Sequence, residues 1–161
     1  LSDNLPRTFV ILHVIPHLKE LVAARQGGNF LKCYLTTTFF CPCLFALQFR
    51  DQRQKYYEIL QRWQEIEEEV VDYPEFHRND FTVVVSPILK HVKIPLAEDG
   101  YIDLSYLSAD LANNLWNTLL EPVGNKSTTW ISAYEKFVCP TAERPFLMTR
   151  ENSKGINEME G

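Results

Sequence analysis

The stretch FTVVVSPIL, residues 81–89, is a run of apolar and β-branched residues with three consecutive valines near its start. Such a run lacks the alternation of a half-exposed strand and is typical of a strand buried on both faces, as in a parallel sheet. A second run of this kind, TFVILHVI, occupies residues 8–15 and ends before Pro16. The sequence therefore predicts two buried strands.

The clearest helical pattern of the chain lies between these two runs, from Arg50 to Val71. Apolar side chains recur there on one helical face, and charged side chains occupy the other face. The apolar set is Tyr56, Ile59, Leu60, Trp63, Ile66, Val70 and Val71. Because two parallel strands need a long crossover, this strand, helix and strand predict a parallel unit of the α/β class.

Two strands do not make a complete doubly wound sheet. We therefore expect an incomplete α/β layer, with further strands supplied by a preceding part of the domain; a small and poorly covered fold is the alternative. The apolar face of the helix at 50–71 is then either ordinary core or a surface that would cover the absent strands.

The remaining elements are shorter. Residues 17–25 predict a helix that the Gly27-Gly28 pair stops, and 77–80 predict a turn. Residues 96–109 read as a polar loop, after which leucines stripe a final helix over 111–120. Asp110 is placed to cap that helix, because its carboxylate can accept the first free backbone N–H groups.

The domain organisation follows from where this last helix ends. Residues 1–124 form the partial α/β domain, and residues 125–161 form a coil-rich C-terminal extension. The last stretch of that extension, 151–161, is polar and predicts disorder.

Charge and hydropathy exclude two broad classes of function. The 161 residues carry a net charge of −5 and no basic patch, so we expect no nucleic-acid partner. The apolar runs are all shorter than a membrane span, so no segment of this sequence is expected to cross a bilayer. The sequence begins at Leu1 without a signal peptide, which fits a mature product or a piece of a longer protein.

The cysteines favour disulfides over a metal site. Cys33, Cys41 and Cys43 lie in the aromatic-rich stretch CYLTTTFFCPC, predicted as a loop, and Cys139 lies far downstream. The Cys-Pro-Cys spacing is too tight for a zinc site and no histidine lies nearby, so we expect neither metal nor cofactor. Cys33 can pair with Cys41 or with Cys43. The sequon at Asn125 agrees with an oxidising, secreted setting.

The residues alone establish no catalytic motif. The sequence has no Gly-x-Ser-x-Gly elbow, phosphate-binding glycine loop or His-Glu-x-x-His pattern. Ser86 and His91 follow the second strand, at the sheet edge where sites of parallel sheets lie, but no base stands beside Ser86 in sequence. His91 is interpreted as a surface histidine, and His13 as a buried histidine with its hydrogen bonds satisfied.

Specific stretches resemble a known family. LWNTLLEPVG (115–124) and FVCPTAERPFLMTRENS (137–153) resemble the helix that ends the catalytic domain of the animal membrane-associated phospholipase B enzymes, and the segment after it. DFTVVVSPIL and DLSYLSAD resemble that domain's last strand and the loop leading to its catalytic dyad. The family belongs to the GDSL, or SGNH, lipases. The resemblance implies the C-terminal part of a three-layer α/β/α sandwich around a parallel sheet, here incomplete.

The family's mechanism uses a serine nucleophile, an oxyanion hole and an Asp-x-x-His motif that supplies the base and its orienting acid. Asp110 matches the aspartate of that motif, but Asn113 stands at the histidine position, as if a segment after Asp110 were deleted. The Gly-Asp-Ser and Gly-x-Asn-Asp blocks are absent as well. The same deletion would remove a cysteine, which implies that Cys139 is a free thiol unless it pairs with Cys33, Cys41 or Cys43.

The resemblance thus implies a phospholipase B-like acyl-ester hydrolase that is truncated and inactive alone. Its substrates in the full-length family would be phospholipids or lysophospholipids, at a membrane surface. The location would be extracellular or at the cell surface, through the full-length parent. The alternative is a non-catalytic secreted module that binds a lipid or a protein, through Tyr56, Tyr57 and Trp63 or through the cysteine stretch.

Overall fold

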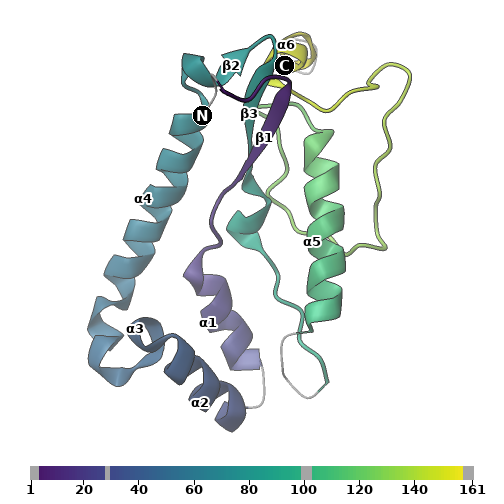
Figure 1. The fold of residues 1–161 in the computed structure, drawn as a ribbon. Coiled ribbons are helices and arrows are strands. Elements are labelled where there is room, and N and C mark those ends of the chain that lie inside the picture. The colour runs from purple at the N-terminus through teal and green to yellow at the C-terminus, as the bar shows by residue number, and fades with distance from the viewer. Residues whose placement is uncertain (1–3, 28–29, 99–102, 158–161) are drawn as a thin grey trace.

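A small mixed sheet lies at the centre of the computed structural model, which describes residues 4–27, 30–98 and 103–157 (Figure 1). Within these residues the sheet has three strands, in the order β1-β3-β2. Their bounds are β1 Thr8–His13, β2 His77–Arg78 and β3 Phe81–Ser86. β1 and β3 run parallel and β2 runs antiparallel to β3, so the predicted parallel pair is confirmed and the chain has an incomplete α/β fold.

Helices make up most of the remaining chain. The α-helices are α1 Leu18–Gly27, α2 Phe30–Phe40, α3 Pro42–Phe45, α4 Arg53–Val71, α5 Leu104–Leu119 and α6 Arg150–Asn157. Short 3-10 helices are η2 Leu47–Gln52, η3 Pro74–Phe76 and η4 Pro87–His91. The strands lie between α4 on one side and α5 on the other (Figure 1). The cysteine stretch forms α2 and α3, so the prediction of a loop there was wrong.

β3 is the buried strand of the pair, and β1 is an edge strand. Their register runs from Thr8 opposite Phe81 to His13 opposite Ser86. Four of the six β3 side chains are buried, whereas every β1 residue is only partly buried. Among the described residues no strand pairs with the outer edge of β1. The prediction of complete burial was therefore right for most of β3 and wrong for β1, which lacks a neighbour.

The core has two clusters among the described residues, one against the sheet and one beyond its end. Val71 of α4 packs with Phe81 and Val83 on one side. Ile88, Val92 and Trp130 pack together beyond the end of β3, against Leu107 and Leu111 of α5 and the nearby Leu89. Val71 thus attaches α4 to β3, whereas α5 packs on η4 and the segment that follows it.

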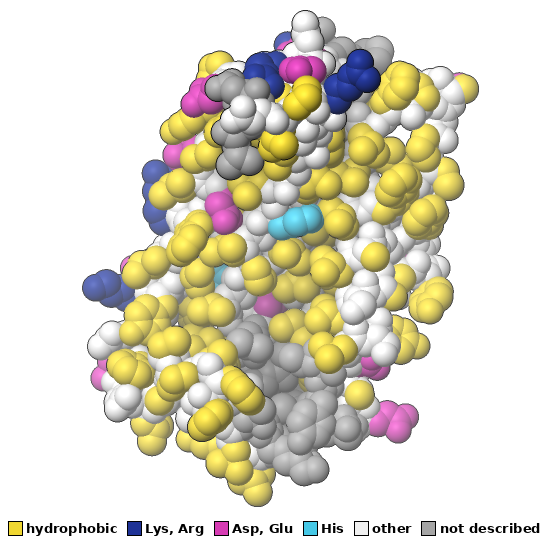
Figure 2. All heavy atoms as spheres, in the orientation of Figure 1, with side chains coloured by type: hydrophobic (Ala, Val, Ile, Leu, Met, Phe, Trp, Pro, Cys, Tyr) yellow, Lys and Arg dark blue, Asp and Glu magenta, His cyan; other side chains and the backbone are white. Residues whose placement is uncertain are grey.

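The predicted apolar stripe of α4 lies in this core only at Val71, and the middle of the stripe is exposed. Ile59, Trp63 and Ile66 are 51%, 55% and 43% exposed. α4 instead docks through a polar clamp, in which Gln64 Nε2 donates to the carbonyl of Ile15 at 2.7 Å and Glu67 Oε2 accepts from the Ile15 N–H at 3.1 Å. Figure 2 shows hydrophobic side chains gathered between α4 and α5, over β1. The stripe is therefore free to cover further structure.

α5 starts seven residues earlier than the sequence predicts, and this changes the role of Asp110. Asp103 caps the helix, with its Oδ1 accepting from the N–H groups of Ser105 and Tyr106, both at 3.1 Å. Asp110 lies inside α5, so the prediction that it caps this helix was wrong. The predicted loop at 96–109 is helical from Leu104 onward, and residues 99–102 lie outside the described part.

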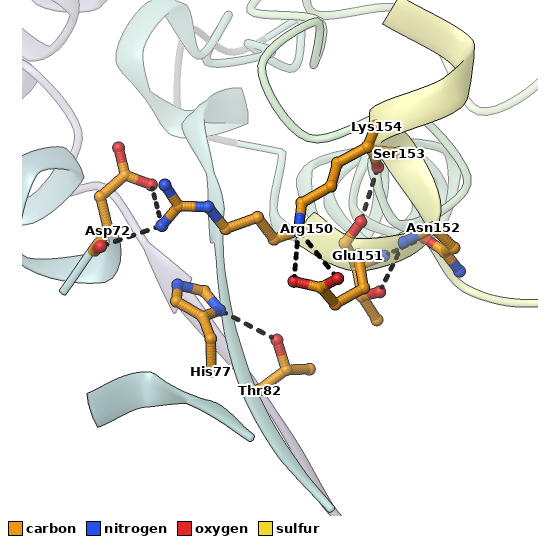
Figure 3. A network of polar contacts seen from close by, with 9 residues as sticks. Asp72, His77, Thr82, Arg150, Glu151, Asn152, Ser153 and Lys154 are labelled. Atoms are coloured by element: carbon orange, nitrogen blue, oxygen red, sulfur yellow. Dashed lines mark hydrogen bonds and ion pairs between the residues drawn. The ribbon is translucent and has the colours of Figure 1, made fainter. Parts of the chain in front are cut away.

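The C-terminal segment returns to the sheet and ends in α6. From 120 to 149 the backbone forms neither helix nor strand. The prediction of disorder at 151–161 was wrong as far as Asn157, because α6 is ordered there; 158–161 lie outside the described residues. Arg150 Nη1 donates to the Asp72 carbonyl at 2.9 Å, which fixes α6 to the end of α4 (Figure 3).

Candidate functional site

Asp110, the residue that matches the motif acid, is buried and engaged in a structural contact. Its side chain is 8% exposed, and its Oδ1 accepts a hydrogen bond from the Ala133 N–H at 2.8 Å. Its backbone carbonyl accepts from Asn114 Nδ2 at 2.7 Å. The carboxylate therefore holds the segment after α5.

Three asparagines continue this face of α5. Asn114 binds both backbone groups of Ile131, accepting from its N–H at 3.0 Å and donating to its carbonyl at 2.6 Å. Asn117 accepts from the Val138 N–H at 2.8 Å and donates to the Lys136 carbonyl at 3.0 Å. Because 131–138 lacks regular structure, these amides satisfy backbone groups that no helix or strand would pair.

Asn113, which falls at the histidine position only in an ungapped comparison with the motif, belongs to the same row of α5 amides that bind the segment 131–138. Its Nδ2 donates to the Lys136 carbonyl at 3.0 Å, while its buried Oδ1 has no hydrogen-bond partner within the described ranges. An amide has no proton-accepting nitrogen near neutral pH, so it cannot act as a general base. Asp110 and Asn113 are close on one helix, but together they anchor a loop.

The parallel register brings His13 and Ser86 to the same level of the sheet, a juxtaposition that the sequence reasoning missed. Ser86 is 1% exposed, and its Oγ lies 3.3 Å from Thr118 Oγ1. His13 Nδ1 is buried without a partner within the described residues, so the prediction of a satisfied histidine was wrong. Burial lowers the pKa of His13, which keeps it neutral. A buried Ser86 that faces Thr118 does not offer an accessible nucleophile.

The other histidines have different surroundings. His77 Nε2 lies 2.8 Å from the Val71 carbonyl and its Nδ1 lies 3.5 Å from Thr82 Oγ1, so this ring joins α4 to β3 (Figure 3). His91 is exposed at the end of η4, as its interpretation as a surface histidine predicts. Across residues 4–27, 30–98 and 103–157, no cluster of three His, Cys, Asp or Glu could hold a metal.

Two adjoining cavities lie beyond the carboxyl ends of β1 and β3. The first, of about 340 Å³, is lined mainly by polar side chains, including His17, Lys19, Glu20, Glu65, Lys90 and His91. The second, of about 290 Å³, is lined almost entirely by apolar ones, including Leu18, Leu89, Ile94, Leu107, Leu111 and Trp130. His17 and Glu20 border both cavities. Ligands of parallel sheets bind at this edge.

The cysteines show no predicted pairing among the side chains that the structure describes. Cys41, Cys43 and Cys139 are free thiols, and the side chain of Cys33 lies outside the described part. Cys43 and Cys139 are exposed. The predicted disulfide of Cys33 with Cys41 or Cys43 is therefore not formed in this structure.

Asn125 is exposed in a turn after α5, where a glycan could be attached. The neighbouring Lys126 folds back, and its Nζ donates to the carbonyls of Thr118 and Glu121. Burial lowers the pKa of Lys126 to about 8, partly offset by the negative charge of Glu121. Ser127, the third residue of the sequon, donates from its Oγ to Glu121 Oε1 at 2.7 Å. Glycosylation of Asn125 stays a prediction.

Comparison with known proteins gives relatives of a single kind. Human "Phospholipase B1, membrane-associated" is 33% identical over 172 residues, which cover 96% of this chain and 11% of the human protein. The rat protein of the same name is 33% identical over 168 residues, covering 94% and 11%. The mouse protein is 38% identical over 88 residues, covering 47% and 6%.

The chain spans about a tenth of the length of the human and rat relatives. No family model and no solved structure matches it. The relatives are named membrane-associated, while no helix within the described ranges is long and apolar enough to cross a membrane.

Proposed function

We infer that this chain, which is a phospholipase B-like family member, supplies one part of a serine ester hydrolase domain and is inactive alone. The observation that carries the inference is the similarity to phospholipase B1 over nearly the whole chain, at a tenth of that protein's length. The substrates of the complete domain would be phospholipids or lysophospholipids. Its setting would be the cell surface or the extracellular side of a membrane, with Asn125 glycosylated.

The state of the candidate residues supports inactivity. Ester hydrolysis by a serine enzyme needs an accessible hydroxyl, a base that takes its proton and donors for the oxyanion. Ser86 is buried against Thr118, and Asn113 cannot take a proton. Asp110 holds the Ala133 N–H through Oδ1, and Asn113, three residues further along the same helix, offers it no imidazole to orient. The nucleophile and base would have to come from chain outside this sequence.

Two surfaces support the idea of a larger domain. No strand in the described part of the chain pairs with the outer edge of β1, so backbone N–H and C=O groups face outward there, and folded proteins normally cover such an edge. The exposed side chains of Ile59, Trp63 and Ile66 form an apolar stripe on α4. Both surfaces would be buried if further parallel strands extended the sheet beyond β1.

The direct test is hydrolysis by the purified chain, with p-nitrophenyl butyrate and lysophosphatidylcholine as substrates. We expect no turnover above buffer, because removal of a serine or histidine from such a site ordinarily costs several orders of magnitude in rate. Turnover that Asp110→Ala abolishes, with the variant's circular dichroism unchanged, would overturn the inference. Asp110→Asn, which keeps an acceptor for Ala133, separates loss of charge from loss of structure.

The exposed stripe also favours a second candidate function, a non-catalytic module that binds lipid or protein. Trp63 lies at its centre and is 55% exposed. Flotation with phosphatidylcholine vesicles tests the lipid form of this idea: Trp63→Ala should abolish flotation, whereas Tyr73→Ala, another exposed aromatic residue, should not. Absence of flotation by the unaltered chain would dismiss vesicle binding.

A further inference from the structure

The start of α1 is held by the side chain of the residue that precedes it. The carbonyl of His17 accepts the Glu20 N–H at 3.1 Å, which closes the first turn of the helix. The ring Nδ1 of His17 accepts the backbone N–H of Lys19, also at 3.1 Å. A side chain that accepts one of the first free N–H groups of a helix is an N-cap. α1 is therefore capped by an imidazole, whose ability to accept depends on its protonation state.

The ring of His17 also contacts α4, which lies beside α1 (Figure 1). The ring centroids of His17 and Tyr57 are 5.4 Å apart, and His17 is hydrogen-bonded to the Tyr57 backbone. The Nζ of Lys19 lies 5.5 Å from the centroid of the same Tyr57 ring. Two residues at the beginning of α1 thus dock on one residue of α4.

The two hydrogen bonds of His17 define which nitrogen carries the proton. Because Nδ1 accepts the Lys19 N–H, the proton of the neutral ring lies on Nε2, which is left to donate to the Tyr57 backbone. A second proton would make Nδ1 a donor that faces another donor, at the positive end of the helix dipole. The charged ring therefore has to rotate away from the Lys19 N–H, and this rotation breaks the cap and the bond to Tyr57 together.

Charged and titratable groups from three elements surround this ring. They are Lys19 and Glu20 of α1, Tyr57 and Glu65 of α4, and Lys90 and His91 of η4. Burial, and next the charge of Lys19, lower the pKa of His17 from its ordinary value of 6.5. The bond to Tyr57 and the charge of Glu20 oppose this shift, and the charge of His91 adds to it. Because the folded chain favours the neutral ring, the cap stabilises α1 fully above pH 6.5 and is lost as the pH falls below that value.

The capped turn is also a wall of the two cavities beyond the ends of β1 and β3. His17 and Glu20 border both cavities, Leu18 lines the apolar one and Lys19 lines the polar one. A displacement of this turn therefore changes the access of solvent and ligands to both cavities.

We propose that His17 is an acid-sensitive cap, whose protonation releases the start of α1 from α4 and opens the wall that α1 gives to the two cavities. Ile15 stays bound to α4 through Gln64 and Glu67, so the movement begins after that residue. The cap requires neither hydrolysis nor a particular ligand, and it therefore stands apart from the proposed function.

The experiment is hydrogen–deuterium exchange of the purified chain at about pH 7.5 and about pH 5, with exchange times scaled to the intrinsic amide rates. The amides of α1 should exchange about fivefold faster at the acidic pH, as expected for the loss of one N-cap. The amides of α4 are the internal reference for global stability and should change by less than about twofold.

Three variants assign the effect to the cap. His17→Asn supplies a side-chain oxygen that accepts the Lys19 N–H at either pH, so α1 should stay protected at both. His17→Ala has no acceptor, so α1 should exchange fast at both; if this variant fails to fold, His17→Asn carries the test. His91→Asn removes the other histidine of the polar cavity and is the matched control, which should keep the pH dependence of the unaltered chain.

Three results would overturn the proposal. The first is equal scaled exchange of α1 at the two pH values in the unaltered chain. The second is a pH dependence that persists in His17→Asn. The third is loss of the pH dependence in His91→Asn, which would assign the effect to His91 instead.

Discussion

The carboxylate of Asp110 accepts the backbone N–H of Ala133 at 2.8 Å, and this contact joins α5 to a segment that has no regular structure of its own. Asp110→Ala leaves that N–H without its partner in a partly buried place. The expected cost is about 1–3 kcal/mol of unfolding free energy, measured by urea denaturation. Asp110→Asn keeps an acceptor and should cost less. Equal stability of Asp110→Ala and the unaltered chain would show that the contact contributes nothing.

The different hydrogen bonding of Asn113 and Asn114 predicts that their substitution by alanine destabilises the chain to different extents. Among the described residues, Asn114, which is 2% exposed, makes three hydrogen bonds, whereas Asn113 makes one and its Oδ1 has no partner. Asn114→Ala should therefore destabilise the chain by about 1–3 kcal/mol more than Asn113→Ala does, in the same denaturation assay. A larger loss of unfolding free energy for Asn113→Ala than for Asn114→Ala would contradict this assignment of hydrogen bonds.

The structure clarifies why the parallel pair could be read from the sequence and the start of α5 could not. The apolar runs at 8–15 and 81–89 are rich in adjacent β-branched residues, which favour strands, although only β3 proved to be mostly buried. The stretch before Asp110 contains serines and a tyrosine, which suggest a loop. Leu104, Leu107 and Leu111 nevertheless recur at helical spacing, and Asp103 stands just ahead of them as the cap. That spacing was a readable signal.

The sequence did not allow the burial of the α4 stripe or the position of the cavities to be predicted. Periodicity defines an apolar helical face but does not say whether the chain itself covers that face. Gln64, a polar residue, is buried while Trp63 beside it is exposed, because the clamp on Ile15 rotates α4. The cavity between Leu18 and Leu111 depends on contacts between residues distant in sequence, for which local patterns carry no information.

Thiol reactivity should follow the exposure of the cysteines. Cys43 and Cys139 are exposed free thiols and Cys41 is partly buried, so a disulfide reagent should modify Cys43 and Cys139 in the folded chain faster than Cys41. Peptide mapping of the labelled sites measures this order, and Cys139→Ser should remove one fast site. Recovery of two disulfides after denaturation would contradict the free-thiol state.

Lys126 should make stability depend on pH in the alkaline range. Burial lowers its pKa in the folded chain to about 8, below its ordinary value of 10.5. Between these two values the unfolded chain binds more protons than the folded chain, so the free energy of unfolding should rise with pH from about 8 to about 10. Lys126→Met removes the titrating group and should flatten this rise, although it loses two bonds to carbonyls. A rise that persists in the variant would assign the effect to another group.

The exposed stripe of α4 should govern self-association more than stability. Trp63 is 55% exposed, so Trp63→Glu removes apolar surface without disturbing buried contacts and should change the free energy of unfolding by about 0.5 kcal/mol or less. Because an uncovered apolar face promotes association, the variant should remain monomeric at concentrations where the unaltered chain sediments as larger species. Val71→Glu on the same helix places a charge in the core and should instead unfold the chain. Sedimentation velocity and urea denaturation of the two variants separate these effects. Equal self-association of Trp63→Glu and the unaltered chain would show that another surface mediates the association.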